Sequence, residues 1–130
     1  MDDTIIDDRV RVRVGQSVRG GRGVFASSRF VPGEQLDACP VLVVPASEAE
    51  TVCATILGQY AFAWDDDGSV ALALGTVSLL NHDADPNASY VRGDDADTMV
   101  VYASRVIEAD DEILIDYTGG GALPLWFTPT

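Results

Sequence analysis

The densest cluster of polar side chains lies in residues 81–87, whose sequence is Asn-His-Asp-Ala-Asp-Pro-Asn. Together with Asp94, the acidic and amide side chains of this segment have the spacing of ligands in a calcium-binding loop. Ala88 stands where that loop requires glycine, however, and Pro86 interrupts it. Calcium binding is therefore the weakest of the functions that this segment suggests.

His82 is the only histidine in the chain. A lone histidine can act as a general base, bind a metal ion or form a hydrogen bond in a turn, and the turn is the commonest of these roles. Without a second histidine, neither a Ser/His/Asp triad nor a histidine-rich zinc site is well supported. We predict no metal site.

A glycine motif occurs in residues 21–26, which read Gly-Arg-Gly-Val-Phe-Ala. The segment matches GxGxxA, the permissive form of a dinucleotide-binding fingerprint. That fingerprint must open a helix, yet Pro32 and Gly33 interrupt the chain soon afterwards and Val24-Phe25 favours a strand. We interpret the segment either as a plain β-turn or as a place where the backbone approaches a ligand closely, because glycine has no Cβ.

Residues 112–117, Glu-Ile-Leu-Ile-Asp-Tyr, form a third segment, with polar side chains at both ends. By itself this pattern is typical of an edge strand that ends on a tyrosine, Tyr117. Three glycines and an apolar tail, residues 123–127, follow it. We expect a tail this apolar to dock on another surface.

The charge distribution favours basic partners over nucleic acids. The formal net charge is −13, and residues 31–130 contain seventeen acidic residues against two arginines. Such a field repels phosphates and attracts lysine-rich or arginine-rich segments. The same acids could also do no more than solvate the surface. We expect no direct binding of nucleic acid.

The length and composition predict one folded domain over residues 1–130. The chain is 47% hydrophobic, close to the globular norm. Its longest apolar run, residues 70–80, is too short to span a bilayer, and the acidic N-terminus is unlike a secretory signal. We therefore predict no membrane association and a cytoplasmic location. Cys39 and Cys53 are expected to be two buried thiols.

Short strands are the elements that must position these segments. Residues 9–14 alternate arginine and valine, which predicts a strand with its valines facing inward. Further strands are expected around Leu36 and in three apolar stretches, residues 41–44, 99–102 and 113–115.

A hairpin and a helix complete the expected elements. The Asp-Gly pair at residues 67–68 predicts a hairpin between residues 60–64 and 70–74. Ser47 and Glu50 have the spacing of a capping box, and the helix that they open should end near Gly58. Its expected buried face consists of Val52, Cys53, Ile56, Leu57 and Tyr60. The fold class is therefore small and mostly β.

The order of three motifs resembles the SET-domain family of lysine methyltransferases. These motifs are GxG followed by Val-Phe-Ala, then Asn-His-x-x-x-Pro-Asn, then Glu-x-x-x-Asp-Tyr. The resemblance covers about residues 10–127, and the spacing is most similar to that of the small viral members. It implies a SET-domain fold of short strands in small sheets, with one short helix and a C-terminal pseudoknot. Asp83 departs from the usual serine and Ala84 from the common cysteine, and the zinc modules that flank larger members are absent.

The resemblance also implies S-adenosylmethionine as cofactor. In such a site, backbone groups of Arg22 and Gly23 would meet the methionine part of the cofactor. The Asn81 side-chain amide would bind its amino end, and the His82 backbone would meet the edge of the adenine. Trp126, or its neighbour in the tail, would stack on the adenine face.

The family's chemistry is an in-line attack of a neutral lysine amine on the cofactor's methyl group. By the resemblance, Tyr117 contacts the cofactor and is the catalytic residue, since its hydroxyl would orient the amine. Tyr60 would line the lysine channel, and Tyr102 is a weaker candidate for the same position.

The expected substrate is a lysine of a basic protein, histone-like or otherwise lysine-rich. The small viral members work as homodimers, so the resemblance also implies a homodimer. The main alternative is a non-catalytic module that keeps the fold and recruits a basic partner through its acidic surface. A calcium-responsive interaction domain is a third and weaker alternative.

Overall fold

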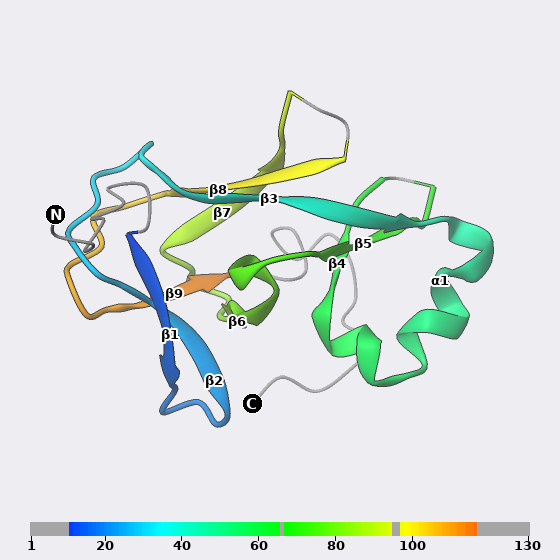
Figure 1. Ribbon diagram of the computed structural model, residues 1–130, viewed down its shortest axis with the longest axis horizontal. Coiled ribbons are helices and arrows are strands. Elements are labelled where there is room, and N and C mark those ends of the chain that lie inside the picture. Colours follow the sequence, from blue (N-terminus) through cyan, green and yellow to red (C-terminus); the bar gives the residue numbers. More distant parts are fainter. Residues whose placement is uncertain (1–10, 66, 95–96, 117–130) are drawn as a thin grey trace, which may run out of the picture.

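Two small sheets make up most of the molecule. The computed structural model describes residues 11–65, 67–94 and 97–116. One sheet has four strands in the order β1-β2-β9-β6, and the other has five in the order β4-β5-β3-β8-β7. Figure 1 shows the first sheet at one end of the molecule, with the second running from it toward the helix α1 at the other end. The fold is mostly β, as the sequence predicts.

The four-stranded sheet joins distant parts of the chain. It consists of β1 (Val12–Gln16), β2 (Arg22–Ala26), β9 (Glu112–Ile115) and β6 (Asn81–His82). β1, β2 and β9 are antiparallel neighbours, whereas β6 runs parallel to β9. A parallel neighbour cannot be reached through a tight hairpin turn, so a long connection must separate these two strands.

The five-stranded sheet is antiparallel throughout. Its strands are β4 (Ala61–Ala63), β5 (Val70–Ala73), β3 (Gln35–Val44), β8 (Thr98–Ala103) and β7 (Ala88–Arg92). β4 and β5 form the hairpin that the Asp-Gly pair predicts, and Gly68 has a φ of 93° in its loop. Such a φ favours glycine, which explains the residue's place in the turn.

β3 is one strand where the sequence suggested two. It runs unbroken for ten residues, and a shift of register between Gln35 and Asp37 marks a bulge at its start. The N-terminal strand also differs, because Val14 is 45% exposed whereas Val12 packs against the core. Both valines point to the same face of β1, because they are two residues apart, but the core covers this face at Val12 and not at Val14.

The predicted capping box is wrong, and the predicted apolar helix face holds only for Val52 and Cys53, which pack against a small apolar cluster. The helix α1 (Ala46–Cys53) starts after Pro45, whose backbone takes the cap position without a side-chain hydrogen bond. It ends before residue 54, and a separate 3-10 helix, η1 (Ile56–Tyr60), follows. Thr55 caps that second turn, accepting a hydrogen bond from the backbone N–H of Leu57 at 3.2 Å. Ile56 is consequently 69% exposed instead of buried.

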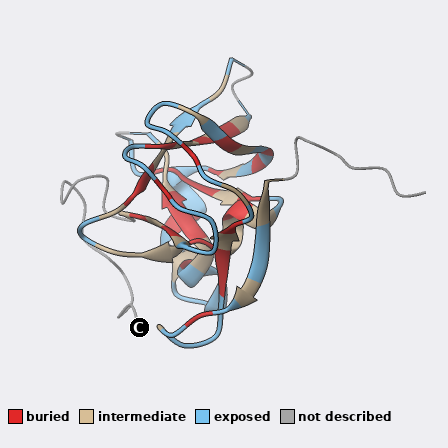
Figure 2. Ribbon diagram, turned by 90° about the vertical axis from the view of Figure 1, so that its left-hand side faces the viewer, coloured by how far each residue is buried: buried red, intermediate tan, exposed pale blue. Residues whose placement is uncertain are grey.

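The main core draws side chains from both sheets. Val24 and Ile113 come from the four-stranded sheet, and Phe62, Met99 and Val101 come from the five-stranded one. A second 3-10 helix, η2 (Thr76–Leu79), adds Val77 to the same cluster. Figure 2 shows the buried positions concentrated where the strands meet. The strands next to the segments with possible chemistry are therefore anchored by the core.

Candidate functional site

The structure places parts of all three sequence motifs on three neighbouring strands of one sheet, β2, β9 and β6. β9 lies between β2 and β6, with Val24 opposite Ile113 and Asn81 opposite Leu114. The glycine motif and the Asn-His segment therefore flank the strand that carries Glu112. Tyr117, Trp126 and Phe127 lie outside the described residues.

The side chain of Asn81 is fixed by two acceptors. Its Nδ2 donates to the carbonyl oxygen of Arg22 at 3.0 Å and to Oε2 of Glu112 at 2.7 Å. An amide nitrogen has two hydrogens, so both are used. No described residue donates to Oδ1 of Asn81, which is left as an acceptor for a ligand. The arrangement fits a ligand group that donates hydrogen bonds or carries positive charge.

Glu112 is held in turn by Ser17 in the turn after β1. The Ser17 hydroxyl lies 2.8 Å from Oε1 and 3.0 Å from Oε2 of the carboxylate. The same hydroxyl oxygen accepts the backbone N–H of Arg19 at 3.0 Å, and Ser17 is buried. Because the Arg19 N–H can only donate and the Glu112 carboxylate can only accept, the Ser17 hydroxyl directs its hydrogen toward Glu112. Sequence analysis assigned no role to Ser17 or to Glu112.

Gly23 has a structural reason to be glycine. A Cβ at this position would lie 2.3 Å from Oε2 of Glu112 and 3.1 Å from Nδ2 of Asn81. The first distance is far below any tolerated contact, so a side chain here would displace the carboxylate. The sequence suggested that the glycine lets a ligand approach. The structure shows that it admits the Glu112 carboxylate.

An ion pair ties the β1–β2 turn to the Asn-His segment. The Arg19 guanidinium binds the Asp83 carboxylate, and its Nη1 also donates to the carbonyl oxygen of His82 at 3.3 Å. The pKa of Asp83 is lowered, first by the backbone N–H of Asp85 and then by Arg19. Asp83, which stands where serine is usual, therefore forms an ion pair with Arg19 that a serine could not form.

Three of the side chains expected to bind calcium, those of Asp83, Asp85 and Asn87, have other partners in the structure. The buried side chain of Asn87 bridges β9: its Nδ2 donates to the carbonyl of Glu112 at 2.9 Å, and its Oδ1 accepts from the N–H of Leu114 at 2.8 Å. Asp83 is bound to Arg19. Within the described part of the chain, no three carboxylate, histidine or cysteine side chains gather in a way that could hold a metal ion.

His82 faces the end of β9. Its Nδ1 lies 3.7 Å from Oδ1 of Asp116, and both side chains are largely buried. Asp116 also contributes, after burial, to raising the pKa of Tyr90. The Tyr90 hydroxyl donates to the carbonyl of Ala63 at 3.2 Å. Tyr90, which the sequence did not single out, therefore joins β7 and β4, the two edge strands of the five-stranded sheet.

Tyr60 and Tyr102 are both half-buried but lie apart in the fold. Tyr60 ends η1, directly before β4, and Tyr102 lies on β8 opposite Gln35 and Ser89. The structure records no hydrogen bond or ring contact for either side chain within the described residues. The geometry does not bring either tyrosine into the network around Asn81.

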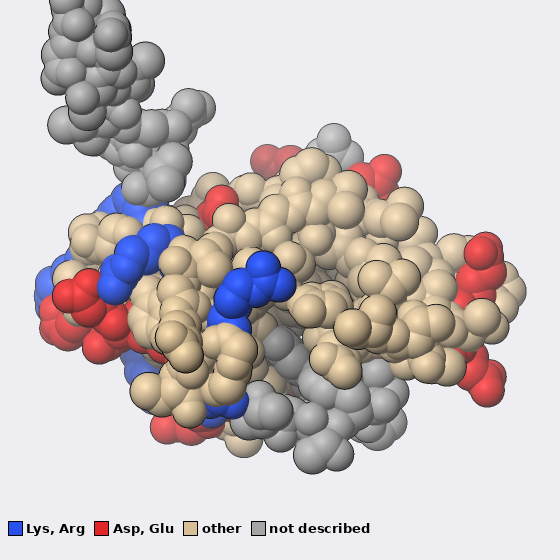
Figure 3. Space-filling model, turned by 60° about the horizontal axis from the view of Figure 1, so that its bottom comes forward, with Lys and Arg blue, Asp and Glu red and all other residues tan. Residues whose placement is uncertain are grey.

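The charges on the surface are unevenly distributed. Figure 3 shows arginine side chains at the end of the molecule that carries β1 and β2, and acidic side chains alone at the opposite end. Among the described arginines, Arg22 is the one for which no described carboxylate is a partner. The other six pair with Glu34, Asp110, Asp83, Glu108, Asp65 and Asp85.

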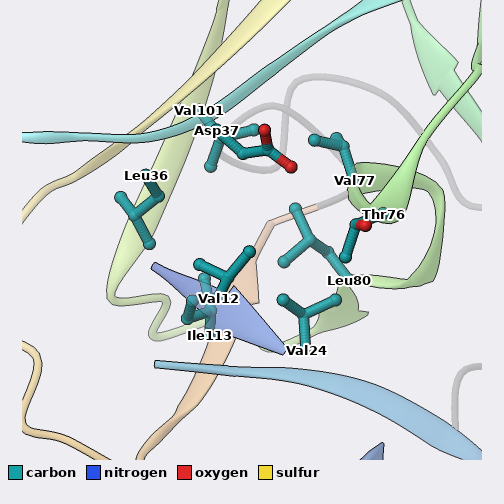
Figure 4. A pocket seen from close by; sticks show the side chains of 9 residues that line it. All are labelled: Val12, Val24, Leu36, Asp37, Thr76, Val77, Leu80, Val101 and Ile113. Atoms are coloured by element: carbon teal, nitrogen blue, oxygen red, sulfur yellow. The ribbon is translucent and has the colours of Figure 1, made fainter. Parts of the chain in front are cut away.

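Two hollows lined by described residues lie away from the network around Asn81. A cavity of about 10 Å³ lies in the core and has room for at most one water molecule. Figure 4 shows the side chains from both sheets that enclose it, Asp37 and Thr76 being the polar ones. A shallow hollow of about 430 Å³ lies beside α1, lined by residues such as Ala49, Cys53 and Val70.

No described helix is long and apolar enough to cross a membrane.

Comparison with curated proteins finds relatives among histone methyltransferases. A histone-lysine N-methyltransferase of Schizosaccharomyces pombe, specific for lysine 37 of histone H3, is 31% identical over 120 residues. The match covers 92% of this chain and 78% of the relative. A histone H3 lysine-4 methyltransferase of Cryptococcus neoformans is 30% identical over 116 residues, covering 82% of this chain and 8% of that much longer protein.

Solved structures agree with this likeness. A candidate histone methyltransferase of Plasmodium falciparum matches with a TM-score of 0.67 and 31% identity, over 82% of this chain and 92% of that one. A SET-domain histone lysine methyltransferase of Neurospora matches with a TM-score of 0.62 over 82% of this chain and 51% of that one. At 21% identity, the second match shows the fold alone.

The sequence profile of the SET domain matches residues 21–118, which include all three motifs. This match covers most of the chain, and the fold and the curated relatives agree with it. The chain belongs to the SET-domain family of lysine methyltransferases.

Proposed function

We propose that this protein transfers a methyl group from S-adenosylmethionine to the side-chain amine of a lysine in a basic protein. One observation carries the proposal: the amide of Asn81 is oriented by Glu112 and Arg22 so that Oδ1 alone remains as an acceptor. That acceptor, beside a carboxylate, suits the ammonium group at the methionine end of the cofactor. Family membership supports the rest of the assignment.

The residues present fit the cofactor. Asn81 would hold the ammonium through Oδ1, with the Glu112 carboxylate adding negative charge 2.7 Å from the amide nitrogen. Backbone groups of Arg22 and Gly23 lie beside it, although the Arg22 carbonyl already accepts from Asn81. The His82 backbone remains our assignment for the adenine edge, and Trp126 for its face. When bound, the cofactor supplies a methyl group activated by a positively charged sulfur.

The protein's own part in the reaction is orientation. A lysine amine has an ordinary pKa of about 10.4 and must be neutral to attack. We assign Tyr117 to contact the cofactor and to orient the amine through its hydroxyl, and Tyr60 to line the channel through which the lysine arrives. A narrow, apolar channel favours the neutral amine, because burial disfavours the charged form.

The charge of the chain supports a basic substrate. With a net charge of −13, and with six described arginines already paired, the surface attracts lysine-rich segments before any specific contact forms. The names of the two curated relatives give histone H3 as their substrate, which supports the same class of substrate here. The homodimer and the cytoplasmic location stay predictions.

Titration with S-adenosylhomocysteine, the reaction product, tests the cofactor assignment. We expect saturable binding in a calorimeter, weakened about tenfold or more by Asn81→Ala, because one hydrogen bond to a charged group is lost. Gln59→Ala removes an exposed amide near α1 and serves as the control, with unchanged affinity expected. Failure of the unaltered protein to bind would overturn the proposed cofactor.

Transfer of radiolabelled methyl groups to histones or another lysine-rich protein tests the activity itself. We expect label on lysine with the unaltered protein. Tyr117→Phe should reduce turnover by orders of magnitude while leaving S-adenosylhomocysteine affinity nearly intact, because the ring remains and only the orienting hydroxyl is lost. Association with the basic protein but no label would favour a non-catalytic binding module instead.

A further inference from the structure

A continuous chain of hydrogen bonds connects the β1–β2 turn to the acceptor atom of the proposed cofactor site. It runs from the N–H of Arg19 to the Ser17 hydroxyl, from there to the Glu112 carboxylate, and on to the Asn81 amide. Ser17 and Glu112 are 95 residues apart, and Glu112 and Asn81 are 31 apart. Three separate elements are therefore needed to place one amide.

We propose that Glu112 and Ser17 are positioning residues that hold the Asn81 amide with Oδ1 toward the cofactor's ammonium group. The proposal rests on the function proposed above and names the residues that make its binding atom available. Neither side chain needs to touch the cofactor. Their effect is transmitted through Asn81.

The orientation of an asparagine amide is decided by its neighbours, because the two orientations have nearly the same shape. Here both neighbours, the Glu112 carboxylate and the Arg22 carbonyl, can only accept hydrogen bonds. A turn of the amide by 180° would place Oδ1 against two other oxygens. Without Glu112, only the carbonyl of Arg22 at 3.0 Å would oppose that turn.

Ser17 fixes the carboxylate itself. Its hydroxyl contacts both oxygens of Glu112, so the carboxylate plane is set before it meets Asn81. Burial of Ser17 keeps water from competing for that contact. Gly23 leaves the space that the carboxylate occupies. The network therefore depends on residues of the turn, β2 and β9 together.

Two substitutions separate hydrogen bonding from charge. Glu112→Ala removes both the acceptor and the negative charge, so the amide is free to turn. Glu112→Gln keeps an oxygen that can accept from Asn81 but removes the charge. Glu108→Gln, on the exposed connection before β9, changes the net charge equally and is the matched control.

NMR of protein labelled with ¹⁵N-asparagine measures how firmly the hydrogen bonds of the Asn81 amide hold it in place. The chain has two asparagines, and Asn81→Ala identifies which side-chain signal belongs to each. We expect slow hydrogen exchange of the Asn81 amide in the unaltered protein and in Glu112→Gln, fast exchange in Glu112→Ala, and an exchange rate between these two in Ser17→Ala. Asn87 should stay protected in all of them, which reports that β9 is still in place.

Affinity for S-adenosylhomocysteine gives the second measurement. We expect Glu112→Ala to weaken binding about tenfold to a hundredfold, as for a lost charge-assisted hydrogen bond, and Ser17→Ala to weaken it less. Glu108→Gln should bind as the unaltered protein does.

The two measurements distinguish the inference from the function on which it rests. Unchanged exchange of the Asn81 amide in Glu112→Ala would overturn the positioning role. Fast exchange of that amide with unchanged affinity for S-adenosylhomocysteine would overturn it as well. Loss of Asn87 protection together with loss of affinity would show a merely structural role. Absence of binding by the unaltered protein would overturn the proposed function, and the cofactor part of this inference with it.

Discussion

The two ends of the molecule are stabilised in different ways. At the β1–β2 end, polar side chains from distant segments are joined: Ser17 to Glu112, Arg19 to Asp83 and Asn81 to Glu112. At the α1 end, a small apolar cluster of Val44, Ala49, Ala61 and Val70 packs under the helix. Hydrogen bonds require particular atoms at particular places, whereas apolar contacts require mainly volume. Binding of a ligand should therefore depend on the first end and tolerate changes in the second.

A pair of glycine substitutions gives the largest expected contrast. In Gly23→Ala the new Cβ would meet the Glu112 carboxylate at 2.3 Å, and in Gly58→Ala it would meet the backbone oxygen of Cys53 at 2.2 Å. We expect Gly23→Ala to lower S-adenosylhomocysteine affinity about 100-fold, since the carboxylate and the Asn81 amide are both displaced. Gly58→Ala should leave that affinity unchanged.

Gly58→Ala should lose more stability, about 1–3 kcal/mol, because its Cβ would meet backbone atoms of Cys53, whereas the Glu112 carboxylate met in Gly23→Ala ends a flexible side chain and can move. Urea unfolding would measure that loss, and calorimetry the affinity. If Gly58→Ala weakened binding as much as Gly23→Ala, the two ends would not be independent and the comparison would fail.

The same substitution at two buried valines, one at each end of the molecule, sharpens the comparison between the two ends. Val24 on β2 is 2% exposed and Val70 on β5 is 5% exposed. Either valine replaced by alanine should destabilise the protein by about 2 kcal/mol through lost contacts and a residual cavity. We expect Val24→Ala alone to weaken S-adenosylhomocysteine binding, because Val24 adjoins Gly23. Equal affinities for the two variants, at equal loss of stability, would count against the special role of the β1–β2 end.

The smallest expected effect concerns the Arg19–Asp83 ion pair. Binding partners lower the pKa of Asp83 in the folded protein, so its contribution is present above the unfolded carboxyl's pKa of about 4. The contribution is lost as the pH falls through the lower, folded pKa. We expect Asp83→Asn to cost about 1 kcal/mol at pH 7 and nothing once the carboxyl is protonated.

Asp85→Asn supplies the matched control for this test. Asp85 also pairs with an arginine, Arg105, but its side chain is 87% exposed and the pair should contribute little. Urea unfolding of both variants between pH 7 and pH 2 checks the prediction. An effect of Asp83→Asn that stayed constant across this range would show that the carboxylate's charge is not what stabilises the turn.

Local patterns predicted the elements well where one residue type decides the backbone. The Asp-Gly pair fixed the β4–β5 hairpin, and Gly68 indeed has a positive φ. The helix was harder, because Ser47 and Glu50 match a capping box while Pro45 already occupies the cap position. Val52 and Cys53 of the predicted buried face do pack on the apolar cluster, but Thr55 then starts a new turn and leaves Ile56 exposed.

The site could be predicted in part. The order of the three motifs identified the family, and Asn81 was named for its side-chain amide before any partner was known. Ser17 gave no signal, because a serine after a strand is most often a turn residue and its partner lies 95 residues away. Asp83 was noticed only as a departure from the usual serine, and nothing in the local sequence links it to Arg19.

The place of β9 in its sheet bears on how the protein folds. β9 is the last of the described strands along the chain, yet it lies between β2 and β6 in the sheet. During synthesis, β2 and β6 lack this shared neighbour until residues 112–115 have left the ribosome. Closing such long loops is slow. The ligand-binding end of this protein should therefore be the last part to form, after the antiparallel sheet has already folded.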